Sequence, residues 1–86
     1  MNPTKPVNTA KVTICGEELV LKGQESEEYM QSIAQEVSLR MERLRAMYPT
    51  MVRHRLAVLA AIYLADELAK LRQEYSRVLD AAKEAR

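Results

Sequence analysis

The sequence has few of the residues that support small disulfide-bonded or all-β domains. Its 86 residues include one cysteine, two glycines, four tyrosines, and no tryptophan or phenylalanine. A single thiol cannot form a disulfide within the chain, and a secreted domain of this size usually depends on several disulfides. Leu, Ala, Val, Met and Ile supply most of the 48% hydrophobic residues. This composition favours helices over a β-sandwich.

Neither an excess of one charge nor a long hydrophobic run is present. The 13 basic and 12 acidic residues leave a formal net charge of +1, which gives no overall attraction to nucleic acid or to anionic membranes. The longest apolar run, residues 56–65, would reach about 15 Å as a helix, roughly half of a bilayer core. The first residues also lack the apolar stretch of a signal peptide. We therefore expect a soluble, cytoplasmic protein with no membrane partner.

Residues that carry catalytic or metal chemistry are scarce. His54 is the only histidine and Cys15 the only cysteine, so no set of His or Cys residues has metal-ligand spacing. The sequence contains no phosphate-binding loop and no dinucleotide-binding motif. The prediction is a protein that is not an enzyme and has no cofactor or metal. Cys15 is interpreted as a half-buried strand residue and His54 as a surface residue at a helix start.

A β-hairpin is predicted over residues 11–22. Val12 and Ile14 alternate with polar residues before Gly16, and Leu19 and Leu21 alternate with polar residues after it. This period of two indicates strands, and a Gly16-Glu17 turn would join them. The four apolar residues would share one face, and that face needs a cover because an isolated hairpin is marginally stable in water.

A first helix is predicted from Ser26 onward. Ser26 is a good N-cap, and Glu27 and Glu28 follow in the first turn, where the helix dipole favours negative charge. Pro49 disfavours helical geometry at Tyr48, so the helix should end there. Apolar residues recur between these limits at steps of three and four, as on one helix face: Met30, Ile33, Ala34, Val37, Met41 and Leu44.

A second and much longer helix is predicted from Thr50 to the C-terminus. No Gly or Pro interrupts this stretch, and most of its residues are strong helix formers. Residues 56–65 are apolar all round, which is typical of a helix that is buried on every side. The apolar positions then narrow to a stripe with steps of four and three, typical of a coiled coil: Leu64, Leu68, Leu71, Tyr75, Val78, Ala82 and Ala85.

One copy of the chain cannot cover these apolar surfaces. Each large side chain of the stripe would forgo roughly 1.5–3 kcal/mol of burial free energy if it stayed in water. Copies of the chain should therefore associate, most simply as a two-fold dimer. A homotetramer stays open as an alternative, because Tyr75 and the alanines make a weak coiled-coil core. The residues predicted to mediate oligomerisation are Leu56, Leu59, Ile62, Leu64, Leu68, Leu71, Tyr75 and Val78.

Together these elements predict an α+β fold that exists only as an oligomer. A small head, made of a β-hairpin and a short helix, precedes a long C-terminal coiled-coil helix. Residues 1–10 contain two of the three prolines and are predicted to form a flexible N-terminal arm. Residues 11–65 would form the globular head, and residues 66–86 the coiled-coil helix.

Basic residues concentrate where the first helix ends and the second begins. Only Glu42 offsets them between positions 40 and 55. Three interpretations are open: solvated arginines that stabilise a helix C-terminus, a protein-binding patch, since Arg is favoured in interfaces, or a nucleic-acid site. No aromatic stacking set accompanies the charge, which makes nucleic acid the least favoured. The residues of this arginine cluster are Arg40, Arg43, Arg45, Arg53 and Arg55.

In its order of elements the chain resembles the ZapA family of cell division proteins. The resemblance covers residues 11–83 and rests on the opening strand Val12-Thr13-Ile14-Cys15-Gly16, on "KGQESEEYMQSIAQEVSLRM", and above all on "RLAVLAAIYLADEL". No single motif is very specific, but the ordered combination is. The short length is similar to that of members from Gram-positive bacteria.

The resemblance implies a partner and an activity. The heads of family members pair into a dimer, and their coiled-coil helices can join dimers into an antiparallel tetramer. Family members bind FtsZ, the tubulin-like division GTPase, through charged residues of the head, and they cross-link its protofilaments at midcell. Arg45 and Arg40 fall where members often carry basic residues, so both are expected to contact FtsZ. Glu17 and His54 depart from the pattern, since some members have an arginine and an acid there. Two alternatives are open: a small dimeric nucleic-acid-binding or regulatory protein, and a generic coiled-coil assembly or chaperone subunit.

Overall fold

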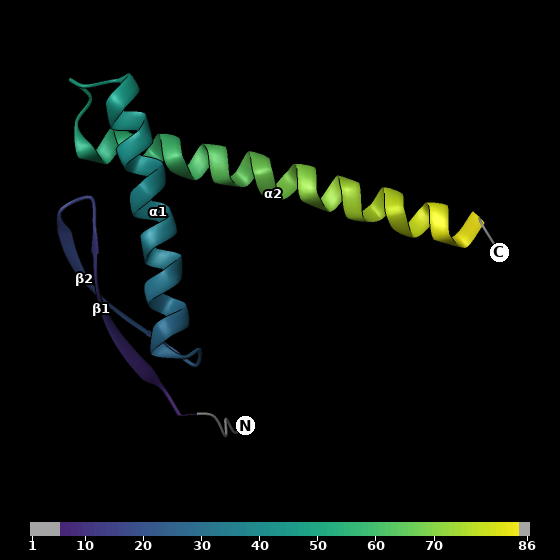
Figure 1. Cartoon of the computed structure of the whole chain (residues 1–86), viewed down its shortest axis with the longest axis horizontal. Coiled ribbons are helices and arrows are strands. Elements are labelled where there is room, and N and C mark those ends of the chain that lie inside the picture. Colours follow the sequence, from purple (N-terminus) through teal and green to yellow (C-terminus); the bar gives the residue numbers. More distant parts are fainter. Residues whose placement is uncertain (1–5, 85–86) are drawn as a thin grey trace.

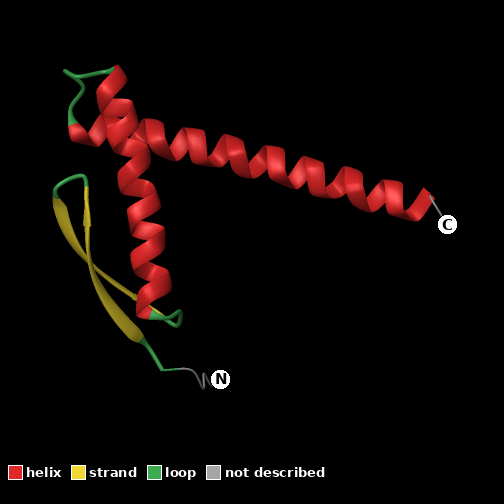
Figure 2. Cartoon of the chain, in the orientation of Figure 1, coloured by secondary structure: helices red, strands yellow, loops and turns green. Residues whose placement is uncertain are grey.

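The computed structural model describes residues 6–84, which form a β-hairpin followed by two helices. The hairpin strands are β1, Asn8–Ile14, and β2, Glu17–Gly23. The helices are α1, Glu27–Met47, and α2, Arg53–Glu84. Helix α1 lies along the hairpin, and α2 crosses α1 near its C-terminal end and then extends away from the head (Figure 1; Figure 2). The predicted α+β architecture with a long C-terminal helix is confirmed.

The hairpin turn lies one residue earlier than the sequence predicts. Cys15 and Gly16 are its two central residues, with φ of 50° and 85°, and Ile14 pairs with Glu17. Two positive φ values define a type I′ turn, whose twist matches that of the flanking strands. The predicted Gly16-Glu17 turn is therefore wrong, and Cys15 is a buried turn residue instead of a half-buried strand residue.

The first strand begins earlier than predicted. Asn8, Thr9 and Ala10 pair with Gly23, Lys22 and Leu21. Ala10 is fully buried, so the flexible N-terminal segment predicted for residues 1–10 cannot extend to residue 10. Its residues 1–5 lie outside the described part of the chain.

Helix α1 begins and ends as its sequence predicts. The Ser26 hydroxyl accepts a hydrogen bond of 3.1 Å from the Tyr29 backbone N–H, which satisfies one of the free donors at the helix start. At the other end the Tyr48 N–H donates to the Leu44 carbonyl at 2.8 Å. Pro49 follows directly and removes the possibility of another helical turn.

Helix α2 begins at Arg53, three residues after the predicted start at Thr50. The Met51 N–H donates to the Tyr48 carbonyl at 3.0 Å, which closes a turn around Pro49 and Thr50. The Met51 side chain packs against the core. This turn and the partly buried Met51 delay the start of the helix. The Leu56 N–H then donates to the carbonyl of Val52, the residue just before α2.

The core forms where α1 meets the hairpin and the start of α2. One cluster lies between α1 and the strands, and the other lies where the two helices cross; Ile14 packs against both. The first cluster consists of Ala10, Val12, Met30 and Ala34. The second consists of Cys15, Met41, Leu44, Leu56 and Ala60.

The chain is far more extended than a compact domain of its length. Its radius of gyration is 17.5 Å and its extents are 52 × 41 × 19 Å. A compact domain of this length would have a radius of gyration of about 12 Å. The difference comes from α2, which projects beyond the head as an isolated helix (Figure 1). From here on we call its projecting part, residues 66–84, the arm.

Candidate functional site

The arm exposes the apolar stripe that the heptad spacing predicts. We call this stripe the arm seam and define it as Leu64, just before the arm, together with Leu68, Leu71, Tyr75 and Val78 of the arm. Leu64 is partly buried, whereas Leu71, Tyr75 and Val78 are 60–67% exposed. Successive members lie four and three residues apart, so they share one side of the helix. A single chain thus presents a continuous apolar surface to water along most of the arm.

The apolar start of α2 is covered on one side only. Leu56 is 1% exposed and packs against Met41, Leu44 and Cys15. The structure places Leu56 in the core of the single chain, so its side chain is not available at the surface to a second copy. Ile62, by contrast, is 58% exposed. The expectation that residues 56–65 are buried all round is not met within one chain.

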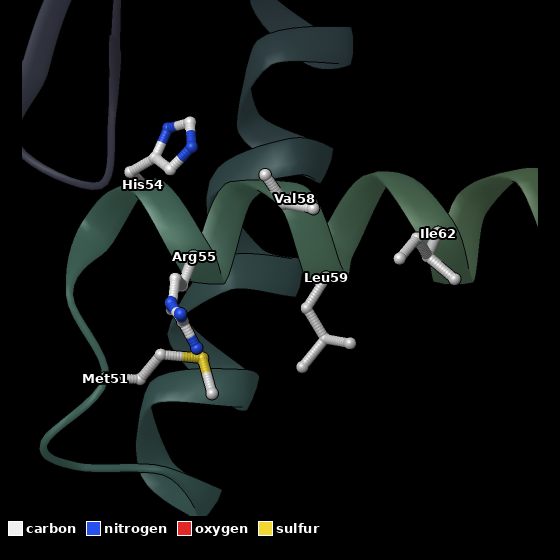
Figure 3. Close-up of a pocket in the computed structure, with 6 residues that line it drawn as sticks. All are labelled: Met51, His54, Arg55, Val58, Leu59 and Ile62. Carbon is white, nitrogen blue, oxygen red and sulfur yellow. The ribbon is translucent and has the colours of Figure 1, made fainter.

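The uncovered side of this segment forms a shallow groove of about 460 Å³. We call it the α2 groove. Figure 3 shows its lining side chains along the first turns of the helix and the preceding loop. Its apolar floor is bordered by two basic residues, which makes it suited to protein contact more than to small polar ligands. The lining residues are Met51, His54, Arg55, Val58, Leu59 and Ile62.

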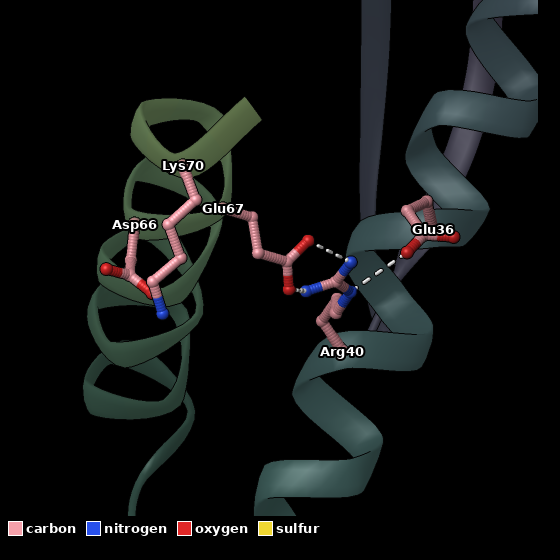
Figure 4. Close-up of polar contacts among 5 residues, drawn as sticks. All are labelled: Glu36, Arg40, Asp66, Glu67 and Lys70. Atoms are coloured by element: carbon pink, nitrogen blue, oxygen red, sulfur yellow. Dashed lines mark hydrogen bonds and ion pairs between the residues drawn. The ribbon is translucent and has the colours of Figure 1, made fainter. Parts of the chain in front are cut away.

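The five residues of the arginine cluster make different contacts in the structure. Arg40 connects the two helices: its guanidinium donates two hydrogen bonds to Glu67 of α2 and one, from Nε at 2.9 Å, to Glu36 of α1 (Figure 4). The contact between the guanidinium Nη2 and Glu67 Oε1 is 2.7 Å long. Bidentate arginine–carboxylate pairs fix geometry as well as charge. Arg40 therefore helps to set the direction in which the arm leaves the head.

These hydrogen bonds shift the pKa values of Glu67 and Arg40. The Arg40 guanidinium lowers the pKa of the Glu67 carboxyl group. Glu67 first, and then Glu36, raise the pKa of Arg40 further. A second pair on the same helix, Asp66 with Lys70 at 2.9 Å, raises the pKa of Lys70 (Figure 4). The ion pair between Arg40 and Glu67 thus adds to the apolar contacts that hold α2 against α1.

Arg45 and Arg53 gather at the hairpin turn. Arg45 Nη2 lies 3.1 Å from Cys15 Sγ and 2.7 Å from a Glu42 carboxylate oxygen. Arg53 Nη1 donates to the Cys15 carbonyl at 3.4 Å, and its Nε lies 3.7 Å from a Glu17 oxygen. Both guanidinium groups remain about half exposed. They can stabilise the turn and still present positive charge to a partner.

Arg43 and Arg55 are the remaining members, and both are exposed. Within residues 6–84 neither takes part in an ion pair. Arg43 lies beside Tyr63 at the helix crossing, and Arg55 lies in the α2 groove. The five arginines thus do not form one basic surface, because three of them have acidic neighbours within the chain.

The comparisons with known proteins agree with this architecture. The sequence model of the family described as "Cell division protein ZapA" matches residues 10–85. The chain belongs to the ZapA family. A ZapA protein of Halalkalibacterium halodurans is 41% identical over 69 residues, which cover 80% of this chain and 75% of the relative. A ZapA protein of Geobacillus kaustophilus is 30% identical over 79 residues, covering 92% and 87%.

The fold has a solved counterpart within the ZapA family. A structure described as a ZapA mutant dimer from Geobacillus stearothermophilus superposes with a TM-score of 0.75. The two chains are 29% identical, and the match covers 96% of each. The hairpin, the short helix and the long C-terminal helix are therefore features that this chain shares with a ZapA protein.

Across residues 6–84, no group of three or more His, Cys, Asp or Glu residues is arranged to hold a metal ion. In the same range, neither helix is sufficiently long and apolar to cross a membrane. Sequence reasoning missed Glu67 as the partner of Arg40, because the two residues are 27 positions apart.

The Arg40–Glu67 contact makes a prediction for pH dependence. The pKa of Glu67 is lower in the folded state, so its contribution to stability is present above the ordinary glutamate pKa. That contribution is lost as pH falls through the lowered pKa.

Glu67→Gln should therefore make the acid side of the stability–pH curve shallower, by a small amount because the pair is exposed. Urea unfolding at a series of acidic pH values measures this. Glu74→Gln, on the exposed arm, is the control, and an unchanged slope in Glu67→Gln would contradict the assignment.

Proposed function

We propose that this chain is a non-enzymatic cell-division adaptor that binds FtsZ and cross-links its protofilaments, promoting assembly of the division ring. The observation that carries the proposal is the exposed arm seam on a chain of the ZapA family. A side chain that leaves water on association contributes roughly 1.5–3 kcal/mol. The seam therefore supports pairing of two copies through their arms, as a homodimer or, with four arms, a homotetramer.

Pairing through the arm provides the geometry that cross-linking needs. The head lies at the start of α2, and the arm projects away from it (Figure 1), so association along the arm leaves charged surfaces of the heads accessible. Two heads on one particle can bind two filaments, or two sites of one filament. Binding of the second head is then governed by an effective concentration, so modest contacts give strong attachment. The ZapA dimer from Geobacillus stearothermophilus supports the pairing step.

We place the activity in the cytoplasm at the midcell division site, because FtsZ acts there. The alternative of a nucleic-acid-binding protein has less support. Arg40, Arg45 and Arg53 lie against carboxylates of the same chain, and so they do not form the continuous basic stripe that phosphate binding requires.

Sedimentation with purified FtsZ tests the proposal. FtsZ polymerised with GTP is spun at low speed, which pellets bundles but leaves single filaments in solution. We expect the protein to enter the pellet with FtsZ and to increase the pelleted fraction. An arm-disrupted variant should bind filaments without bundling them. A wild-type protein that neither pellets with FtsZ nor changes bundling would contradict the proposal.

Charge reversal at Arg45 should weaken FtsZ binding while leaving the oligomer intact. Arg45 is 47% exposed and lies at the hairpin turn, far from the arm. Arg45→Glu changes the local charge by two units, and loss of one interface charge pair commonly lowers affinity by about tenfold or more. The measurement is co-sedimentation over a range of protein concentrations. Arg77→Glu on the arm is the charge-matched control. Wild-type binding by Arg45→Glu would mean that Arg45 stabilises the hairpin turn but does not contact FtsZ.

A further inference from the structure

The loop between α1 and α2 exposes apolar side chains beside the guanidinium group of Arg55. Met47 is 61% exposed, Tyr48 42% and Val52 63%. With Arg55 they border a shallow groove of about 450 Å³ over residues 49–51. We call Met47, Tyr48, Val52 and Arg55 the corner patch. Clustered apolar exposure of this kind often marks an interaction site on a soluble protein.

The exposure is imposed by the fold of the loop. The Tyr48 N–H donates to the Leu44 carbonyl at 2.8 Å, and the Met51 N–H donates to the Tyr48 carbonyl at 3.0 Å. Met51 packs inward against the core, and Pro49 restricts the backbone. Met51 is partly buried against the core, whereas Met47, Tyr48 and Val52 on either side of it are exposed. The groove is thus held in place before any partner binds.

Association through the arm leaves this surface open. Val52 and Leu64 are twelve residues apart, which corresponds to about 18 Å along a helix. The loop lies at the end of the head where α2 begins, and the arm runs away from it (Figure 1). The corner patch and the arm seam can therefore be occupied at the same time.

Charge indicates the chemistry of the occupant. Residues 43–65 include four arginines and His54 but no acidic residue. Arg55 takes part in no ion pair with any residue from 6 to 84, and it lies next to Met51 at the start of α2 (Figure 3). A two-fold contact between two corner patches would bring Arg55 close to its own copy, which is unfavourable. An acidic occupant is favoured over a second copy of this chain.

We propose that the corner patch binds an acidic segment of the partner protein that also carries an apolar side chain. The acidic group pairs with Arg55, and the apolar side chain lies in the groove against Tyr48 and Val52. The identity of the partner as FtsZ rests on the proposed function, but the chemistry of the patch does not. Arg55 provides orientation and the apolar contacts provide burial, as is usual where a charged anchor borders an apolar interface.

A model peptide tests the patch without FtsZ. The probe is a synthetic peptide of aspartate and glutamate residues interrupted by leucine, titrated into the full-length, isotope-labelled protein and followed by amide NMR shifts. We expect shifts concentrated in residues 47–55. Replacing leucine by serine in the peptide should weaken binding several-fold, and replacing the acids by lysine should abolish it. Shifts elsewhere, or none, would overturn the proposal.

Two variants separate the charged and apolar contributions. Arg55→Glu should weaken the acidic peptide by about tenfold or more, whereas Arg77→Glu on the arm should change it less than about twofold. Val52→Ser should lose most of the preference for leucine over serine, the coupling that a double-mutant cycle measures. Equal effects of Arg55→Glu and Arg77→Glu would overturn the proposal. So would corner shifts that depend on protein concentration without peptide, since a second copy would then be the occupant.

FtsZ sedimentation gives a separate answer. Reduced pelleting of Arg55→Glu but not of Arg77→Glu, with wild-type oligomer mass, supports FtsZ as the source of the acidic segment. If wild-type protein fails to pellet with FtsZ but the peptide binds at residues 47–55, the proposed function fails and the corner patch stands. If FtsZ binds wild type and Arg55→Glu equally and the peptide does not bind at the corner, the corner patch fails and the proposed function stands.

Discussion

Replacing Leu68 and Leu71 together by glutamate should lower the mass of the particle in solution while the head stays folded. The two side chains are 47% and 62% exposed in the single chain and lie at the centre of the arm seam. Two carboxylates there would face apolar or like-charged groups of the partner arm. The seam is short, so it cannot compensate for this loss. Light scattering coupled to size-exclusion chromatography measures the mass across protein concentrations.

A matched control comes from the opposite side of the same helix. Gln73→Glu combined with Ser76→Glu adds the same charge to exposed arm positions outside the seam. We expect this variant to keep the wild-type mass. Helix content measured by circular dichroism should fall only modestly in the seam variant, because the head core uses neither Leu68 nor Leu71. An unchanged mass in the seam variant would mean that copies associate elsewhere, and a strictly monomeric wild type would remove the basis for cross-linking.

The arm could be predicted from the sequence because its signal is local. A stripe with steps of four and three residues specifies one side of a helix, and no Gly or Pro interrupts it. The surface that the stripe exposes follows directly from this spacing. The covered side of residues 56–65 could not be predicted, because an apolar residue at every position gives no periodicity. Burial of Leu56 and exposure of Ile62 depend on where α1 crosses α2.

In the hairpin, the position of the turn was predicted wrongly, but the side of the hairpin on which each apolar side chain lies was predicted correctly. Moving the turn from Gly16-Glu17 to Cys15-Gly16 shifts the pairing by two residues, and side chains alternate with a period of two. Val12 and Leu19 therefore remain on one face, now as direct partners. Turn rules favour Gly, Asn or Asp at positive φ, so Cys15 was not expected there. Its N–H donates to the Ser38 hydroxyl at 3.1 Å, a contact that only the folded chain provides.

The arginine cluster could be recognised in the sequence, but which of its arginines pair with acidic residues could not. Composition and position gave five basic residues near one helix junction. Whether each arginine is free depends on neighbours that are distant in sequence, such as Glu67 for Arg40 and Glu17 for Arg53. The corner patch was missed for a related reason. In the sequence, Tyr48 continues the apolar side of the first helix and Met47 is interpreted as a core residue. Both are exposed in the folded chain, where Met51 is the loop residue that packs against the core.

Leu56→Ala should cause the largest loss of stability of any single change in the head. Leu56 is 1% exposed, the lowest value among the large side chains of the described residues. It joins α2 to α1 and to the hairpin turn through Met41, Leu44 and Cys15. Truncating a buried leucine to alanine typically costs about 2–5 kcal/mol, and the cost rises with the volume of the cavity that remains. For a small head this is a large part of the total stability.

Urea unfolding at one fixed protein concentration tests this, because association of the arms adds a concentration-dependent term to the stability. Leu39→Ala is the matched control: Leu39 is 45% exposed on α1, and the same truncation there should change the free energy of unfolding by less than about 0.5 kcal/mol. Leu56→Met, which nearly conserves volume, should cost less than about 1.5 kcal/mol. This graded series remains measurable even if Leu56→Ala is too unstable to fold. Equal losses in Leu56→Ala and Leu39→Ala would mean that the two helices do not depend on Leu56 for their crossing, and the arm would then be oriented chiefly by Arg40 and Glu67.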